Sequence, residues 1–210
     1  MAKILPRAVA PLVTLLAALL PLVACNTGAE QDEQPEEAEA EVAVDEDGEP
    51  LPAGPLPIVP ADIPGLPSSF VIGDVIVSGQ PTPEGLVNVR DSGITLVINT
   101  RMQGEMSFDE RSVVQGLGMR YLNLGFTPST LEDTLVDSFI FELAKRKPED
   151  GKLLVHCSSG PRVAALWAMY EIKALKVDPQ TAVERARKIA PLSTDLVIYI
   201  GDYARRVGAL

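Results

Sequence analysis

Histidine and cysteine are scarce in this sequence, which has one histidine and two cysteines among its 210 residues. No group of histidines, cysteines or carboxylates has the spacing of metal ligands, so we predict neither a metal nor another cofactor. One cysteine, Cys25, lies in a targeting segment described below, which leaves Cys157 as the only thiol of the folded part. An internal disulfide is therefore excluded, and so is a dithiol oxidoreductase, which needs a second, resolving cysteine.

Basic residues are missing from one long stretch. Eleven acidic residues and no Lys or Arg occur between Glu30 and Glu49, so the charge of this stretch, −11, equals that of the whole chain. Residues 51–210 carry a net charge of only −2. The chain has no basic stripe and no basic run interleaved with aromatic residues, which argues against nucleic acid as a partner. Its acidity says little about the substrate of the folded part.

The first 25 residues are typical of a secretory signal peptide. Two basic residues come first, and the apolar run that follows at 9–24 is too short and too interrupted by prolines to span a membrane. The residues Leu-Val-Ala-Cys at 22–25 resemble a bacterial lipoprotein box. This resemblance implies that Cys25 carries a lipid and becomes the mature N-terminus. We therefore predict an exported lipoprotein of the cell envelope, anchored at the periplasmic face of a bacterial membrane.

Residues 26–67 are predicted to form a disordered tether between that anchor and a folded domain at 68–210. The first half of the tether is highly charged and poor in bulky apolar residues, so it cannot bury a core. The second half has seven prolines between positions 50 and 67, which make a semi-rigid spacer. Such a tether would hold the domain away from the membrane surface.

Short apolar runs alternate with amphipathic segments in the domain. Strands are predicted at 70–72, 75–77, 94–98, 119–124 and 153–155, of which the first two form a hairpin. Helices are predicted at 83–92, 107–117, 130–147, 179–189 and 192–206, and one more begins at 163. Thr82 and Ser107 are expected as N-caps, with Glu110 as a capping-box residue. This order predicts an α/β fold with a mostly parallel sheet, in which ligands bind beyond the carboxyl ends of the strands.

The stretch 152–163 is the candidate site. An apolar strand ends at His156, a loop runs from Cys157 to Arg162, and a helix follows. Such a turn directs backbone N–H groups and the positive end of a helix at an anion. Helix N-termini and arginines also favour a thiolate. Cys157 is therefore predicted to be a nucleophile, and Arg162 the cation that holds an anionic substrate. The other substrate-binding residues of the loop are Ser158, Ser159 and Gly160.

Three segments resemble the cysteine-dependent protein tyrosine phosphatase superfamily. They are Val77-Ser-Gly-Gln-Pro-Thr-Pro-Glu84, Leu96-Val-Ile-Asn-Thr-Arg101 and His156-Cys-Ser-Ser-Gly-Pro-Arg162. They are most similar to the phosphatase-like domain of beta-lactamase-hydrolase-like proteins, over residues 68–190. The resemblance implies a phosphatase fold. It also implies that Cys157 takes the phosphoryl group, that Arg162 binds it, and that water then removes it.

The loop departs from the usual phosphatase pattern. It has four residues between Cys157 and Arg162 where phosphatases usually have five, and this spacing also resembles that of rhodanese-type sulfurtransferases, whose cysteine carries a persulfide. A proline in the loop removes one N–H donor. Val163 stands where phosphatases commonly have a Ser or Thr that hydrogen-bonds the departing thiolate. Ser158 or Ser159 could replace that hydroxyl or could cap the loop.

A general acid is also missing from its expected place. The loop at 125–130 has no carboxylate, although phosphate-ester cleavage is helped by an acid that protonates the leaving oxygen. Glu132 and Asp133 come next. Each is a candidate for the acid, and each is also a typical helix-start residue that favours the dipole.

The loops that begin at Asn99, Gly125 and Cys157 are expected to face one crevice at the carboxyl ends of the strands. Three more residues have a candidate role near this crevice. Arg101 and Glu105 could reach it, with Arg101 either a second anion contact or part of a surface salt bridge. His156 is expected to support Cys157 through the backbone or an indirect hydrogen bond rather than to act as a base.

Three functions follow from these residues. The first is an exported, lipid-anchored phosphatase-like hydrolase of phosphoric monoesters, similar to protein tyrosine and dual-specificity phosphatases. The second is a sulfurtransferase that uses a Cys157 persulfide. The third is a non-catalytic module of the cell envelope that binds anions. In each case the expected ligand is a phosphorylated or sulfur-containing anion.

Overall fold

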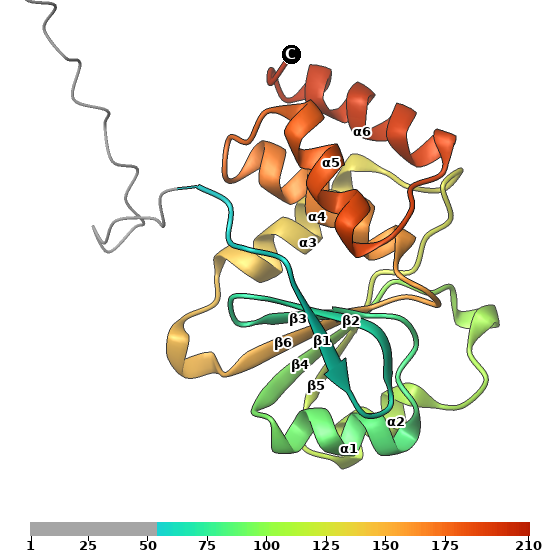
Figure 1. The fold of residues 1–210 in the computed structure, drawn as a ribbon. Helices are drawn as coiled ribbons and strands as arrows, with labels where there is room; N and C mark the ends of the chain where they lie inside the picture. The colour runs from blue at the N-terminus through green and yellow to red at the C-terminus, as the bar shows by residue number, and fades with distance from the viewer. Residues whose placement is uncertain (1–53) are drawn as a thin grey trace, which may run out of the picture. The chain divides into compact units, whose positions relative to one another are not determined.

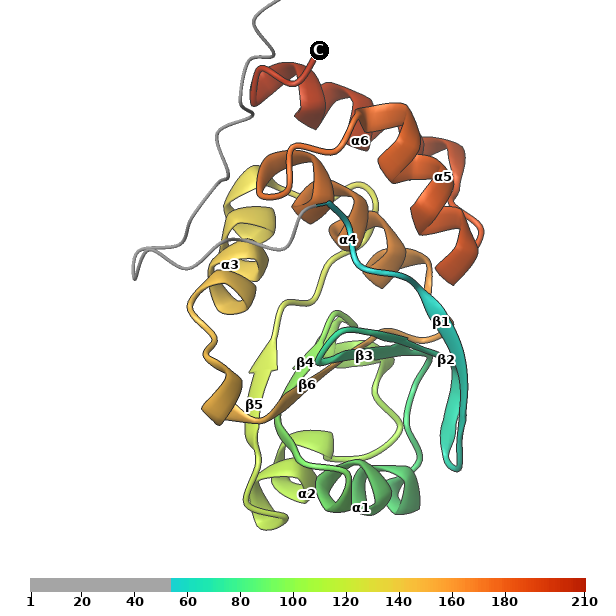
Figure 2. The ribbon, with the colours of Figure 1, turned by 60° about the vertical axis from the view of Figure 1, so that its left-hand side comes forward.

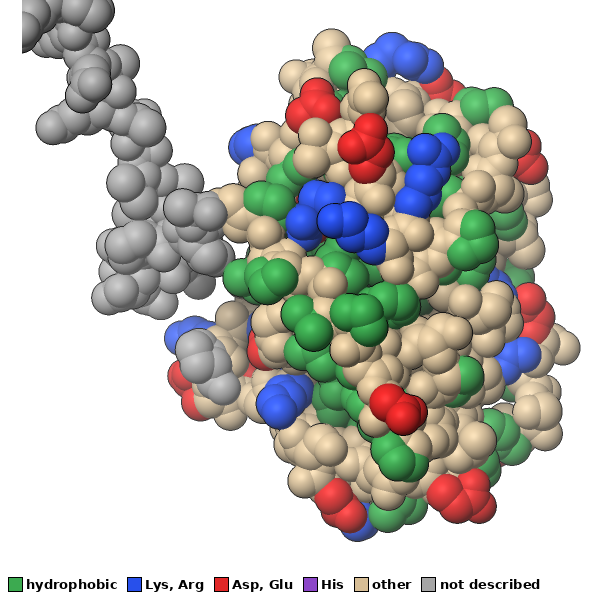
Figure 3. Space-filling model, in the orientation of Figure 1, with side chains coloured by type: hydrophobic (Ala, Val, Ile, Leu, Met, Phe, Trp, Pro, Cys, Tyr) green, Lys and Arg blue, Asp and Glu red, His purple; other side chains and the backbone are tan. Residues whose placement is uncertain are grey.

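The computed structural model describes residues 54–210 (Figure 1). The predicted signal peptide with Cys25 and the acidic half of the tether lie outside these residues. Within the described range, no helix is both long and apolar enough to cross a membrane. On the face drawn in Figure 3, acidic and basic side chains are scattered among hydrophobic and uncharged ones.

A six-stranded sheet forms the centre of this part, and its strand order is β1-β2-β3-β6-β4-β5. The strands are β1 Val59–Ile63, β2 Leu66–Ile72, β3 Val75–Ser78, β4 Ile94–Asn99, β5 Arg120–Asn123 and β6 Lys152–His156. β3, β6, β4 and β5 are parallel neighbours, whereas β1 and β2 are added as antiparallel strands. The predicted α/β fold and the hairpin of β2 and β3 are confirmed.

The start of the sheet corrects the predicted tether, which was extended to residue 67. β1 and the first residues of β2 fall within that range, and Val59 pairs with Val71 in an antiparallel ladder. The prolines were interpreted as a spacer, and this prediction is wrong because β1 is an edge strand, where the missing N–H of Pro60 is tolerated. In β2, the carbonyl oxygen of Pro67 accepts a hydrogen bond from Gly79 N–H at 2.8 Å. Folded structure therefore begins before residue 68.

Helices cover both faces of the sheet (Figures 1 and 2). They are α1 Pro83–Asp91, α2 Glu110–Gly116, α3 Asp133–Ala144, α4 Pro161–Lys173, α5 Pro179–Ile189 and α6 Thr194–Arg206. Two 3-10 turns, η1 Gln103–Glu105 and η2 Pro148–Asp150, lie in the connections. α1 and α2 lie on one face, and α3 to α6 lie on the other.

The central strand β6 is buried from both sides. Leu153 and Val155 join the larger core, which includes side chains of α3 to α6, whereas Leu154 joins the smaller core with side chains of α1 and α2. Burial between two layers explains why the sequence of this strand is continuously apolar. Because β4, β5 and β6 are parallel, the loops after them emerge at one edge of the sheet.

Four helices begin at residues other than those predicted, and one of them, α6, begins at Thr194 rather than at 192. α2 is capped by Asp109, whose side chain accepts from Ser112 N–H at 3.1 Å, so Ser107 is not the cap. α3 begins at Asp133 rather than at 130, and α4 begins at Pro161 rather than at 163. Proline is favoured in the first turn of a helix because the N–H that it lacks has no intrahelical partner there.

Candidate active site

The nucleophile candidate is packed against the start of α4. Cys157 follows the last residue of β6 and is fully buried. Gly160 precedes α4 with a φ of +112°, a conformation that strains any other residue. Its N–H points at Cys157 Sγ, and the N···S distance is 2.9 Å. The sulfur therefore lies at the N-terminal end of a helix, where negative charge is stabilised.

The remainder of the loop carries uncommitted backbone donors. The N–H groups of Ser158, Ser159 and Arg162 donate to no acceptor within residues 54–210, and Pro161 has no N–H. The loop is held from behind, because Gln80 N–H donates to the carbonyl oxygen of Ser158 at 3.1 Å. Three free donors beside a sulfur nucleophile make a site for an anion.

The guanidinium of Arg162 connects the loops that follow three strands. Its Nη1 donates to the carbonyl oxygens of Phe126 at 2.9 Å and Thr100 at 3.2 Å. Nη1 and Nη2 also bind the two carboxylate oxygens of Glu105, at 2.7 and 3.1 Å. None of these contacts uses Nε, so that edge of the side chain can face an oxyanion. The arginine is fixed in place, and its side chain is only 12% exposed.

A cavity of about 310 Å³ lies at Cys157 and Arg162. Its lining residues are Glu105, Thr127, Pro128, Cys157, Ser158, Ser159, Pro161, Arg162, Ser193 and Leu196. They come from the loops after β4, β5 and β6, which the sequence predicted to meet, and from the start of α6, which it did not. A cavity of about 480 Å³ elsewhere is lined by Gln103, Met106, Phe108, Asp109, Arg111, Tyr121 and Asn123. It has no cysteine or serine, so the candidate site is the smaller one.

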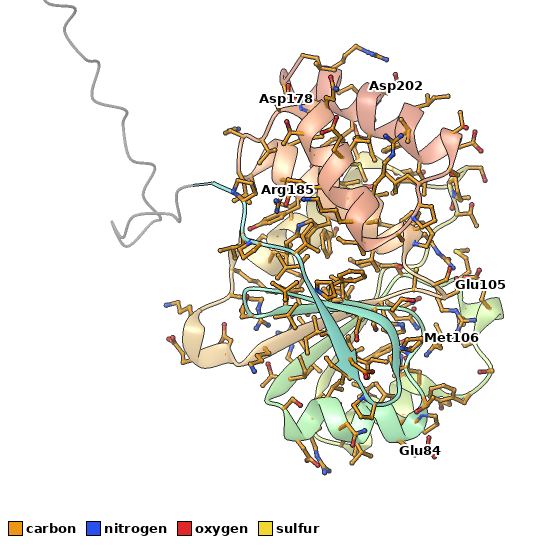
Figure 4. The ribbon with its side chains drawn as sticks, viewed as in Figure 1. Glu84, Glu105, Met106, Asp178, Arg185 and Asp202 are labelled. Carbon is orange, nitrogen blue, oxygen red and sulfur yellow. The ribbon has the colours of Figure 1, made fainter. Side chains whose placement is uncertain are left out.

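Glu105 brings a carboxylate to this cavity from the end of η1. Oε2 accepts a hydrogen bond from Met102 N–H at 2.7 Å, which fixes the turn. The hydrogen bond from Arg162 outweighs burial and lowers the pKa of Glu105, so the group is ionised at neutral pH. In Figure 4, Glu105 and Met106 lie together on the loop that follows β4.

Arg101 is not brought to the cavity. Its guanidinium donates to Oε1 of Gln80 and to the carbonyl oxygen of Glu105. Within residues 54–210 it forms no salt bridge, and it is not among the residues that line the cavity. The side chain instead supports the turn that carries Glu105.

Comparison with known proteins gives sequence relatives of limited coverage. No protein-family model matches the chain. Beta-lactamase hydrolase-like proteins from two strains of Xylella fastidiosa are 27% identical over 101 residues. That alignment covers 46% of this chain and 23% of the relatives, so the chain spans about a quarter of their length.

Solved structures match a larger share of the chain. A DUF442 phosphatase-like protein of Shewanella putrefaciens matches 68% of this chain and 95% of its own, with a TM-score of 0.57 and 17% identity. TpbA of P. aeruginosa, solved with phosphotyrosine, matches 73% and 90%, with a TM-score of 0.55 and 19% identity. The kinase associated phosphatase matches 74% and 98%, with a TM-score of 0.59 and 15% identity. The chain has the fold of the cysteine-dependent protein tyrosine phosphatases.

In this phosphatase fold, the start of α3 supplies no carboxylate to the cavity. Asp133 binds Arg206 at 2.7 Å and accepts from the Tyr199 hydroxyl at 2.7 Å, and the bond from Arg206 lowers the pKa of Asp133. Glu132 is exposed, and neither residue lines the cavity. The two predicted acids are therefore not placed for that role. Asp133 instead ties α3 to α6.

The hydroxyl that phosphatases commonly place after the arginine has no replacement in contact with the sulfur. Val163 is fully buried in the core. The hydroxyl of Ser158 lies 3.5 Å from Nη2 of Arg162, and Ser159 lines the cavity. Within residues 54–210, the hydrogen bond to Cys157 Sγ comes from Gly160 N–H.

A buried carboxylate behind the loop was not predicted. Glu110 lies in the first turn of α2, where the sequence assigned it to a capping box, but its side chain is only 1% exposed. Its Oε1 lies 3.0 Å from Nε2 of His156, and Nδ1 of His156 lies 3.3 Å from the Cys157 carbonyl oxygen. Burial raises the pKa of Glu110, but the close contact with His156 and the hydrogen bonds from Gln80 and Asn99 outweigh it and hold the pKa below its usual value. A local sequence pattern cannot separate this role from capping.

Proposed function

We propose that this chain is a cysteine-dependent, phosphatase-like hydrolase of phosphoric monoesters. The observation that carries the proposal is the sulfur of Cys157, 2.9 Å from Gly160 N–H in a cavity that also contains Arg162. Free N–H groups and a fixed guanidinium suit a tetrahedral dianion. The likeness to phosphatases supports the same function, and phosphotyrosine bound to TpbA makes an aryl phosphate the first substrate to test.

In this mechanism, the loop N–H groups and Nε of Arg162 bind the phosphoryl oxygens. Glu105 holds the guanidinium from the other side. The thiolate of Cys157 attacks phosphorus, so the S–P bond forms as the bond from phosphorus to the leaving oxygen breaks. A water molecule then attacks phosphorus, the S–P bond breaks, and phosphate leaves with both protons of the water. The thiolate is regenerated.

The leaving oxygen must take its proton from solvent. Among the carboxylates of residues 54–210, only that of Glu105 lines the cavity, and it is ionised and bound to Arg162. Unassisted departure favours weakly basic leaving groups. Aryl phosphates are therefore expected to react faster than alkyl phosphates.

Turnover of an aryl phosphate by the purified chain tests the proposal. Activity should disappear in Cys157→Ser and persist in Cys25→Ser, which makes the same change at the other cysteine. Absence of turnover in the unaltered chain, or equal turnover in Cys157→Ser, would refute hydrolysis by this residue.

Sulfur transfer is the second candidate, favoured by the absence of an available acid. The thiolate of Cys157 would attack the outer sulfur of thiosulfate, forming an S–S bond while the bond to sulfite breaks, and a thiol acceptor would then take that sulfur. No leaving oxygen needs a proton in this reaction. Mass spectrometry after incubation with thiosulfate should show one added sulfur at Cys157; an unmodified cysteine excludes this candidate. Anion binding that survives Cys157→Ser, without turnover of either substrate, indicates a binding module instead.

Location at the cell envelope is part of the proposal and is supported by the lipoprotein-box resemblance at Cys25. Labelling of cells with a fatty acid should mark the unaltered chain but not Cys25→Ser. Unlabelled protein, or equal labelling of both, contradicts the lipid anchor.

A further inference from the structure

The two edges of the sheet differ in what they offer to another strand. At the β1 edge, Pro60 lacks an N–H, and the ladder with β2 is irregular between Ala61 and Ile63. Both features hinder further pairing. At the other edge, β5 contains no proline and pairs regularly with β4. β5 lies between α3 and α2 in Figure 2, and no strand of residues 54–210 pairs with its outer side, the β5 edge.

Alternate residues of β5 direct their backbone groups outward. Leu124 N–H donates to the carbonyl oxygen of Asn99 in β4 at 2.8 Å, so the backbone groups of Leu122 and Leu124 point toward β4. Those of Tyr121 and Asn123 therefore point away from β4. These outward N–H and carbonyl groups have no backbone partner in the part of the chain that the structure describes. Such groups are a template for a strand of another chain.

An apolar surface adjoins the β5 edge on the side of α3. A cavity of about 450 Å³ lies there, lined by Leu122, Leu124, Asp137, Ser138, Phe141 and Glu142. The ring of Phe141 is 63% exposed, although Lys145 lies over it. Leu122 and Leu124 beside it are only half-buried. Exposed apolar surface with a polar rim is typical of a site that binds another protein.

Opposite charges lie toward the two ends of this edge. Arg120, at the start of β5, is 67% exposed and lies 3.6 Å from Glu142, near the end of α3. Asp137 comes earlier in α3, lines the cavity with Leu124 and stays half exposed beside Lys173. In an antiparallel pair of such edges, Arg120 of each copy approaches the acidic end of the other. In a parallel pair the two arginines would meet, and like charges repel.

A two-fold axis at Leu122 satisfies the outward backbone groups. Tyr121 would face Asn123 of the second copy, and these residues would exchange both of their N–H···O bonds. The same exchange takes place on the other side of the axis, so no outward group is left unpaired. Leu122 would lie opposite its own equivalent, and the rings of Phe141 would be covered beside this pair.

We propose that this chain forms a symmetric dimer in which the β5 strands of two copies pair antiparallel and join their sheets. A second copy is the partner that matches the β5 edge, because both the hydrogen-bonding pattern and the charge pattern of this edge are complementary to themselves. The dimer also closes the edge, so that no further strand can add to β5. This inference does not depend on the proposed function.

Analytical ultracentrifugation over a wide range of concentration tests the proposal. The full chain carries Cys25→Ser, which removes the predicted lipid and a second thiol, and it should sediment as a dimer. Phe141→Asp should raise the dissociation constant at least about tenfold, because like charges would then face each other across the axis. Ile198→Asp is the matched control, because Ile198 in α6 is 56% exposed and lines neither cavity beside β5. Its dissociation constant should not change.

Cysteine cross-linking in the same background tests the register. Directly opposite residues of a non-hydrogen-bonded pair have Cα atoms about 4.5 Å apart, which is within the range of a disulfide. Oxidation should therefore link two copies of Leu122→Cys. In Leu124→Cys, each cysteine is displaced along the strand by two residues, so the pair is about 13 Å apart and should not link. Cys157 is fully buried and should not link in either variant.

Several results would overturn the proposal. A chain that is monomeric at every concentration leaves the β5 edge to a different polypeptide. A dimer that is unaffected by Phe141→Asp, or that is weakened equally by Ile198→Asp, uses another surface. Cross-linking of Leu124→Cys in place of Leu122→Cys contradicts the register. Circular dichroism establishes that each variant is folded, and if Phe141→Asp is not, the cross-linking pattern decides alone.

Discussion

Replacing Arg162 by lysine keeps a positive charge at the cavity but removes the planar guanidinium. In the structure this side chain reaches the carbonyl oxygens of Thr100 and Phe126 and both carboxylate oxygens of Glu105. These oxygens lie on two different loops, and Nε remains for a substrate. A lysine has one nitrogen with three donors, so it cannot hold both loops and an oxyanion together.

The expected effect on catalysis is large and the effect on folding is moderate. Loss of one preorganised oxyanion donor costs about 10²–10³ in rate, so kcat/KM should fall by at least that factor in Arg162→Lys. For stability, one of the two carbonyl contacts of Nη1 is expected to be lost. A hydrogen bond from a charged donor contributes about 1.5–3 kcal/mol, so the free energy of unfolding should fall by a comparable amount.

The assay compares kcat/KM for an aryl phosphate and the thermal unfolding midpoint in the two proteins. Arg90→Lys is the matched control, because Arg90 is an exposed arginine of α1 whose ion-pair partner within residues 54–210 is the neighbouring Asp91. It should change neither quantity. If the folded Arg162→Lys protein keeps kcat/KM within about threefold of the original, the edge of the guanidinium that carries Nε does not bind the substrate, because the loss of an oxyanion donor lowers the rate far more than that.

Three further predictions concern stability, each measured by thermal or denaturant unfolding. Gly160→Ala should lose about 1–3 kcal/mol, because the φ of +112° strains alanine and its Cβ would lie 2.8 Å from a neighbouring side chain; an unchanged midpoint contradicts this. Glu171→Gln should lose about 3–5 kcal/mol, because it leaves Arg185 without its buried carboxylate partner; a loss below about 1 kcal/mol, of the size typical for exposed pairs, argues against it. The ionised Glu105 stabilises the fold by pairing with Arg162, and Glu105→Gln removes this contribution. The difference in free energy of unfolding between the two proteins should be fully present above pH 4.5 and vanish as the pH falls through the lowered pKa of Glu105, because protonation breaks the pair. A difference that persists in acid disproves this link.

Local patterns predicted the secondary structure well wherever burial produces them. The apolar run of β6 is continuous because two helical layers cover it, and α5 lies where Asp178 and Pro179 indicate a helix start. The errors arose where two local signals competed. Prolines in β1 indicated a spacer, yet an edge strand tolerates them. At α2, Ser107 and Asp109 are both capping residues, and only the path of the backbone selected Asp109.

The candidate site was only partly predictable for a related reason. Cys157, Gly160 and Arg162 are close in sequence, so the strand–loop–helix pattern already implies their proximity. The wall formed by Ser193 and Leu196 comes from α6, and no pattern in the sequence relates it to the loop. Its position follows from how α6 packs on the helical layer.

The sequence by itself determined the α/β fold, the cysteine loop and the arginine that closes it, because each depends on neighbouring residues and on burial. Tertiary structure alone decided the partners of those charged side chains that pair across distant segments. Asp133 could have been a general acid, but packing of α3 against α6 gives it Arg206. Glu110 could have been a capping residue, but the meeting of strand ends gives it His156. Ion pairs form between whichever groups the packed backbone brings within a few ångströms, and that distance is not encoded locally.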